Sequence, residues 1–123
     1  MSVADTAVNP KESEHSMRKL FKTLEYLRDK TGNPDLLVAA VQMLLEVSLR
    51  GETSMTDLES AVGVSQAAIS RNVGKLGGGM TFKEKGAGLV EAYEDPKYRR
   101  QKLVRLTPKS RRLVDELYIL MNA

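Results

Sequence analysis

The sequence predicts a mainly α-helical domain that carries one small antiparallel β hairpin. Apolar residues recur at three- and four-residue spacing in the first and last parts of the chain, as in helices that bury one face. Capping residues and single glycines divide the middle of the chain into shorter units, and after Gly88 the pattern changes to two strand-like runs. The 123 residues amount to a single domain.

The composition excludes several classes of protein. The chain has no cysteine, which rules out a disulfide framework and a thiolate metal site and fits a reducing cytoplasm. The apolar run over residues 36–47 is too short to span a bilayer and contains Gln42 and Glu46, and the first residues lack the pattern of a signal peptide. We therefore expect a cytoplasmic protein with no membrane partner.

The charges are unevenly distributed, although the net charge is only +3. Residues 1–60 carry seven Lys and Arg against ten Asp and Glu, whereas residues 61–123 carry twelve against six. Between Lys97 and Arg112 there are eight basic residues and no acidic one. Such a run is either a solvated face or the electrostatic surface of a nucleic-acid-binding protein.

The first part of the chain is expected to form a tail and two helices. Residues 1–12 lack apolar periodicity and are expected to be disordered. Two N-terminal helices are expected over residues 13–50, and Gly32 ends the first of them. The pair Asn33-Pro34 matches an N-cap and a first helical residue, which predicts that the second helix starts there.

Residues 56–76 are predicted to form a helix–turn–helix. Thr56 and Glu59 fit a capping box at the start of a short helix. Gly63 can adopt the left-handed conformation of a tight turn, and Ser65 then caps a second helix.

Residues 88–107 are predicted to form the hairpin. The two strand-like runs cover residues 88–93 and 101–106, and a loop that contains Pro96 joins them. The last helix is expected over residues 108–121, after a Thr-Pro start signal.

No arrangement of residues predicts catalysis, a cofactor or a metal site. The three glycines from Gly77 to Gly79 are not followed by the lysine and Ser/Thr that a Walker-type phosphate loop requires. His15 is the only histidine, Glu94 and Asp95 fall in a turn, and no cluster of metal ligands is present. We therefore expect a protein that is not an enzyme.

The second helix of the helix–turn–helix has the composition of a helix that reads bases. Its first turns carry short or amide-bearing side chains, which let the backbone approach DNA. Ile69 and Val73 supply a buried face, while glutamine can bond adenine and arginine can bond guanine. The alternative is an amphipathic helix whose polar face is only solvated. The candidate DNA contacts on this helix are Ser65, Gln66, Ala67, Ser70, Arg71, Asn72 and Lys75, with Asn72 and Lys75 expected at phosphates.

Five segments of the chain together resemble a known family. In order they are Met55–Leu58, Val64–Val73, Gly88–Val90, Asp95–Arg100 and Leu103–Pro108. They are similar to the winged helix–turn–helix of the MarR family, over roughly residues 52–112.

The resemblance implies roles for three parts of the chain. Residues 65–75 become the recognition helix, the hairpin becomes the wing, and Arg100 matches the family's arginine that enters the minor groove. The basic residues of the wing that are expected to contact DNA are Lys97, Arg99, Arg100 and Lys102.

The terminal helices become a dimerisation layer by the same resemblance. Two stripes of leucine support this role, because a small monomer could not cover both alone. The candidate dimer contacts are Leu20, Leu24, Leu27, Leu113, Leu117 and Leu120. The expected function is that of a homodimeric transcriptional repressor that binds specific sites in double-stranded DNA.

Three features depart from the family pattern. Residues 77–87 form a glycine-rich insertion, which is either a spacer or an extra arm along DNA. Tyr98 stands where the family often has an aspartate that braces the wing arginines. One helix follows the wing where the family usually has two, so no small-molecule effector is carried over.

The alternative function is a protein-interaction or non-specific DNA-binding module of a phage or plasmid replication or partition assembly.

Overall fold

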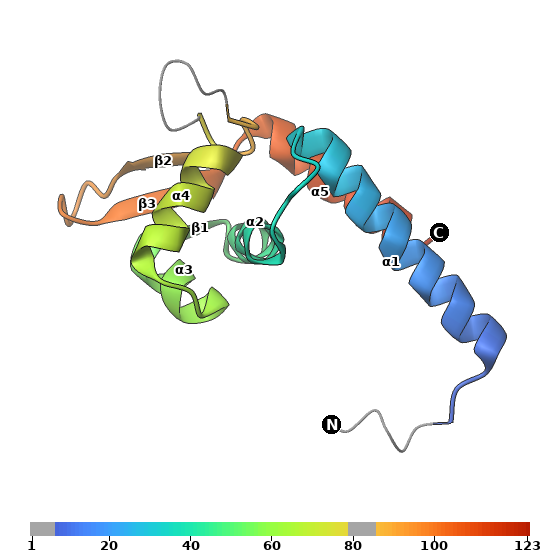
Figure 1. The fold of residues 1–123 in the computed structure, drawn as a ribbon. Coiled ribbons are helices and arrows are strands. Elements are labelled where there is room, and N and C mark those ends of the chain that lie inside the picture. Colours follow the sequence, from blue (N-terminus) through green and yellow to red (C-terminus); the bar gives the residue numbers. More distant parts are fainter. Residues whose placement is uncertain (1–6, 79–85) are drawn as a thin grey trace.

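The computed structural model describes residues 7–78 and 86–123, which form five helices and a three-stranded antiparallel sheet. The elements are α1 (Pro10–Thr31), α2 (Val38–Arg50), β1 (Glu52–Ser54), α3 (Met55–Val62), α4 (Gln66–Leu76), β2 (Val90–Glu94), β3 (Lys102–Leu106) and α5 (Pro108–Met121). In Figure 1, α1 and α5 run side by side as one arm, and the other helices gather beside the sheet. The predicted fold class is confirmed.

Two expectations fall partly outside the described residues. The tail was expected over 1–12, of which 1–6 are not described, and the insertion over 77–87, of which 79–85 are not described. The choice between a spacer and an arm therefore stays open.

Helix α2 is the centre of the core. It contacts α3, α4, β1 and β3, and its inward residues Met43, Leu44 and Val47 are buried. Other buried residues belong to the same cluster, among them Leu58 of α3, Ile69 of α4, Val104 of β3 and Leu89, which directly precedes β2. The helix–turn–helix and the sheet are thus held by one apolar cluster.

The first helix begins at Pro10, three residues before the expected start. Asn9 is its N-cap, and the Asn9 side chain accepts a hydrogen bond from the Lys11 amide at 2.9 Å. The signal is the same Asn-Pro pair that predicted a helix start at Pro34. The start of α1 is therefore set by Asn9-Pro10, and residues 10–12 belong to the helix and not to the expected tail.

The expected helix start at Pro34 was wrong, because α2 begins at Val38. The Asn33 side chain accepts from the Asp35 amide at 3.0 Å, and the Arg28 guanidinium donates to the Pro34 carbonyl at 2.7 Å. These bonds hold a turn, and the Pro34 carbonyl is already engaged when a helix would need it as an acceptor.

The sheet has one more strand than the predicted hairpin. Strand β1 pairs with β3, so that the strand order is β1-β3-β2. Ser54, at the end of β1, caps α3 by accepting a hydrogen bond from the Asp57 amide at 3.0 Å. The expected cap at Thr56 was therefore wrong, and the Thr56 side chain lies exposed on the first turn of α3.

Replacing Gly77 by alanine should destabilise the fold. Gly77 is buried directly after α4, and an added Cβ would lie 2.9 Å from the carbonyl oxygen of Val73 and 3.0 Å from that of Val90. Both oxygens belong to the backbone, so relief requires a shift of α4 or β2, and overpacking of this kind costs about 1–3 kcal/mol. Urea unfolding measures the loss. Gly78→Ala is the control, because a Cβ there meets nothing within 4 Å, and equal unfolding midpoints for the two variants would contradict this account.

Candidate nucleic-acid interface

Helix α4 packs its apolar face against the core and exposes its polar face to solvent. Its N-cap Ser65 accepts a hydrogen bond from the Ala68 amide at 3.2 Å, and Gly63, in the turn before it, takes the left-handed conformation with φ of 76°. Ile69, Val73 and Leu76 are buried in the core. The exposed residues of the helix and its cap include Ser65, Gln66, Ala67, Ser70, Arg71 and Lys75.

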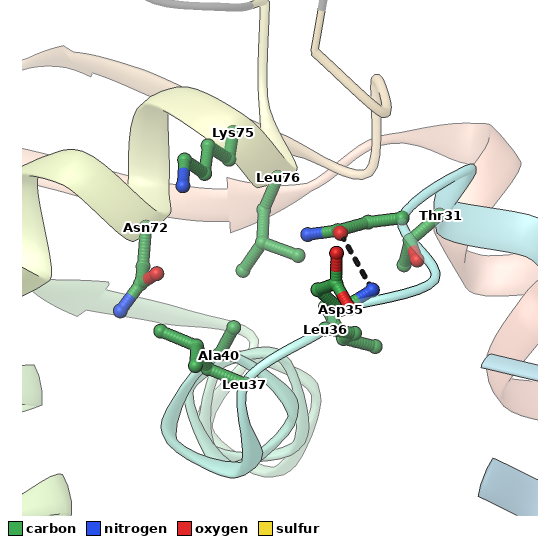
Figure 2. Close-up of a pocket in the computed structure, with 9 residues that line it drawn as sticks. Thr31, Asp35, Leu36, Leu37, Ala40, Asn72, Lys75 and Leu76 are labelled. Carbon is green, nitrogen blue, oxygen red and sulfur yellow. Dashed lines mark hydrogen bonds between the residues drawn. The ribbon is translucent and has the colours of Figure 1, made fainter. Parts of the chain in front are cut away.

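Asn72 is the exception among the residues expected to contact DNA. It is only 6% exposed and lines a pocket of about 290 Å³ between α4 and the turn that precedes α2. In Figure 2 its side chain points from α4 toward Ala40 and Leu37, on the inner side of the helix. The expected phosphate contact by Asn72 was therefore wrong, because its position shares the face that Ile69 and Val73 bury.

The wing is a two-stranded ribbon built on β2 and β3. Glu91 and Arg105 are paired across the strands, and the Arg105 guanidinium lies 3.3 Å from the Glu91 carboxylate. The same guanidinium lies 4.4 Å from the centroid of the Tyr93 ring. Arg105 is thus engaged on the outer face of the ribbon, where such cross-strand pairs stabilise a sheet.

The tip of the wing is an ordered turn. The Asp95 side chain accepts from the Lys97 amide at 2.8 Å, and the Asp95 amide donates to the Gln101 carbonyl at 2.9 Å. Among the described residues, no carboxylate forms an ion pair with Lys97, Arg99, Arg100 or Lys102, all of which are exposed. The turn, fixed by these two hydrogen bonds, and the first residue of β3 thus present four cations to solvent.

A groove of about 490 Å³ brings the helix and the wing together. Gln66 and Ser70 of α4 line one side of it, and Arg100 and Lys102 line the other. The groove also has five lining residues that the sequence did not single out as contacts, Met55, Thr56, Ile69, Tyr98 and Gln101. Thr56 was assigned to a cap, and Tyr98 was noted only as a departure from the family pattern.

Other kinds of site are not found in the part of the chain that the structure describes. Within residues 7–78 and 86–123, no three His, Cys, Asp or Glu side chains are placed to hold a metal ion. Over the same residues, none of the helices has the length and apolar character needed to cross a membrane. A short helix, a tight turn, a second helix and an adjacent β ribbon together define a winged helix–turn–helix domain.

Comparison with known proteins agrees with this class. No family model matches the chain, and neither does any curated protein. RV1404 from Mycobacterium tuberculosis has a similar structure, with a TM-score of 0.69 and 19% identity over 99% of this chain and 79% of that one. A mutant MarR from E. coli complexed with operator DNA gives 0.59 and 18%, over 90% and 74%. BpsR from Bordetella bronchiseptica, whose DNA binding is regulated by 6-hydroxynicotinic acid, gives 0.57 and 22%, over 91% and 79%.

The chain therefore has the MarR-like winged helix–turn–helix fold, as the sequence resemblance predicted. These similarities cover the arm of α1 and α5 as well as the winged domain, since they extend over nine tenths or more of the chain.

Proposed function

We propose that this protein is a transcription regulator that binds specific sites in double-stranded DNA as a homodimer and acts as a repressor. The observation that carries the proposal is the groove in which exposed Gln66 and Ser70 face the wing cations Arg100 and Lys102. Among proteins of similar structure, MarR was solved with operator DNA and PcaV from Streptomyces coelicolor is a transcriptional regulator.

Helix α4 would read bases in the major groove. Gln66 can bond the N6 and N7 positions of adenine, and Arg71 can bond O6 and N7 of guanine. Ala67 is exposed in the first turn, where its methyl group can contact that of thymine. Ser65 caps the helix, and Lys75, on the last turn, is assigned to a phosphate.

The wing would hold the flanking backbone. Arg100 is assigned to the minor groove, where a narrow A·T segment has the strongest negative potential. Lys97, Arg99 and Lys102 are assigned to phosphates on either side of it. Both grooves would then be contacted by one protomer, from one continuous surface.

The dimer would form along the α1 and α5 arm and would use Leu20 and Leu24 of the expected residues, both of which are exposed. Leu27, Leu113 and Leu117 are buried within the chain itself, where α1 packs against α5, so their assignment to the dimer was wrong. Leu120 is half-buried. The apolar residues that this arm leaves exposed are Met17, Leu20, Phe21 and Leu24 of α1 and Tyr118, Ile119 and Met121 of α5.

A two-fold dimer accounts for both specificity and repression. It would place its recognition helices roughly 34–36 Å apart, which fits two half-sites of a pseudo-palindrome. Repression is the proposed outcome, because a dimer bound within a promoter would occupy DNA that polymerase has to contact. Acting on the genome, such a protein would work in the cytoplasm, in keeping with the expectation from the sequence.

Selection of binding sites from random duplex DNA tests the proposal. A pseudo-palindromic consensus is expected, with half-sites one helical turn apart. A pool that shows no enrichment at any salt concentration would contradict specific DNA binding.

The roles of two residues of α4 can be separated on the selected site. Arg71→Ala should cost about 1–3 kcal/mol of binding at one base position and relax selectivity there, whereas Lys75→Ala should weaken all sequences alike. Titrations on the selected site and on random duplex measure both effects. If each variant loses the same factor on both duplexes, the assignment of Arg71 to a base is wrong.

A further inference from the structure

The backbone of residues 87–89 is bonded to the end of the recognition helix. The Ala87 amide donates to the Lys75 carbonyl at 2.9 Å, and the Leu89 amide donates to the Leu76 carbonyl at 2.7 Å. The Gly88 amide donates to the Gly77 carbonyl at 2.8 Å. Two of these amides therefore satisfy carbonyls that the last turn of α4 leaves without a partner, and the third is bonded to the residue that caps the helix, Gly77.

The carbonyls of the same three residues are bonded to the start of α5. The Lys109 ammonium donates to the Ala87 carbonyl at 2.8 Å. The Thr107 hydroxyl donates to the Gly88 carbonyl at 2.7 Å, and the Thr107 amide donates to the Leu89 carbonyl at 3.2 Å. Residues 87–89 thus form a bridge in which each amide is bonded to the α4 side and each carbonyl to the α5 side.

The bridge is held by packing as well as by hydrogen bonds. Leu89 is fully buried and belongs to the same core cluster as Leu76. Gly88 takes a φ of 69°, which a residue with a side chain rarely adopts, and Gly77 is closed in by two backbone oxygens. A displacement of α5 should therefore displace the C-terminal end of α4 as well.

This connection joins two parts of the molecule with different tasks. Helix α5 packs against α1 and β3, whereas α4 packs against α2, α3 and β2. In the proposed dimer, the arm of α1 and α5 sets the position of the partner, and α4 reads the DNA. The distance between the two recognition helices consequently depends on how firmly α4 is tied to α5.

We propose that Thr107 and Lys109 are positioning residues, which fix the recognition helix relative to the dimerisation arm through the backbone of residues 87–89. The inference rests on the proposed function for its effect on DNA. Lys109 is the better of the two for a test, because its side chain is exposed, whereas the Thr107 hydroxyl also caps α5.

The test compares duplexes whose half-site spacing is optimal or is changed by one base pair. Lys109→Met keeps the alkyl stem and removes the donor, and Arg111→Met is the matched control, since Arg111 is also exposed on α5 and loses the same charge. Lys109→Met should reduce the preference for the optimal spacing by about 2- to 10-fold, the range expected for one hydrogen bond, and Arg111→Met should leave it unchanged. Lys109→Arg, which restores a donor, should recover the preference at least in part.

Hydrogen exchange provides a readout that does not depend on DNA. The Ala87 and Leu89 amides should exchange faster in Lys109→Met than in Arg111→Met. Equal exchange in these two variants, or an equal loss of affinity at every spacing, would overturn the proposal and leave Lys109 as one more surface charge. If the wild-type protein binds no duplex at all, the proposed function fails, and exchange alone decides whether the bridge positions α4.

Discussion

Raising the salt concentration from 50 to 200 mM should weaken the binding of the selected duplex by about 10³–10⁵-fold, the range expected for a protein that contacts six to ten phosphates. In each protomer four exposed cations are assigned to phosphates, which makes eight contacts in the dimer; they are Lys75, Lys97, Arg99 and Lys102. Each phosphate contact releases condensed counterions, so the logarithm of affinity should fall linearly with the logarithm of salt concentration, with a slope of about 0.9 per contact. Fluorescence titrations over a series of salt concentrations measure this slope.

A single substitution tests which cations contribute to the slope. Lys102→Ala removes one contact from each protomer of the dimer, so the slope should fall by about 1.8. Lys22→Ala is the control, because Lys22 is exposed on α1, in the arm that lies away from the wing in Figure 1. If both variants change the slope equally, the groove beside the wing is not where phosphates bind.

The fold could be predicted from local signals because most of its boundaries are set by single residues. Ser65 and Thr107 cap α4 and α5 where the sequence predicted, and Gly32, Gly51 and Gly63 end the first three helices. Local signals fail where the outcome depends on a distant partner. Strand β1 has only three residues, too few for a visible alternation, and it forms because β3 pairs with it from about fifty positions further along the chain.

The two Asn-Pro pairs show the same limit. Asn9-Pro10 opens a helix, while Asn33-Pro34 forms a turn whose proline carbonyl is taken by Arg28. Nothing in the pair itself distinguishes the two cases, since the difference lies in the preceding helix and its last residues.

For the DNA-binding site, the spacing of residues along α4 already indicated which side chains are buried. Ile69, Asn72, Val73 and Leu76 stand at i, i+3, i+4 and i+7, the spacing of one helix face, and all four are buried. Applied consistently, this spacing would have excluded Asn72 from the DNA-binding surface. The groove beside the wing is different, because its lining comes from α3, α4 and the turn before β3, and only the tertiary structure brings them together.

Part of each leucine stripe was wrongly assigned to the dimer interface, for a related reason. A stripe that packs within the chain and one that packs against a second copy have the same helical spacing. The structure distinguishes them by exposure, since Leu27 is 2% exposed whereas Leu20 is 52% exposed on the same helix. Only the exposed part of the stripe is available to a partner, and this defines the substitution with the largest expected effect on assembly.

Leu20→Asp should convert the dimer to a monomer and weaken binding to the palindromic site by about 10²–10⁴-fold, because the two half-sites would no longer be bound by one linked molecule. The side chain is half exposed within its own protomer, so the charge should leave the fold of that protomer intact while desolvation opposes burial against a second copy. Light scattering measures the association state, and circular dichroism checks that the helices remain.

Leu49→Asp is the matched control for this substitution. Leu49 is 80% exposed on α2, outside the arm of α1 and α5, so the same change there should leave both the dimer and its affinity for DNA intact. The reverse result, a monomer from Leu49→Asp and a dimer from Leu20→Asp, would move the interface to α2. The recognition helices would then be spaced by a different contact, and the bridge through residues 87–89 would no longer connect them to the dimer interface.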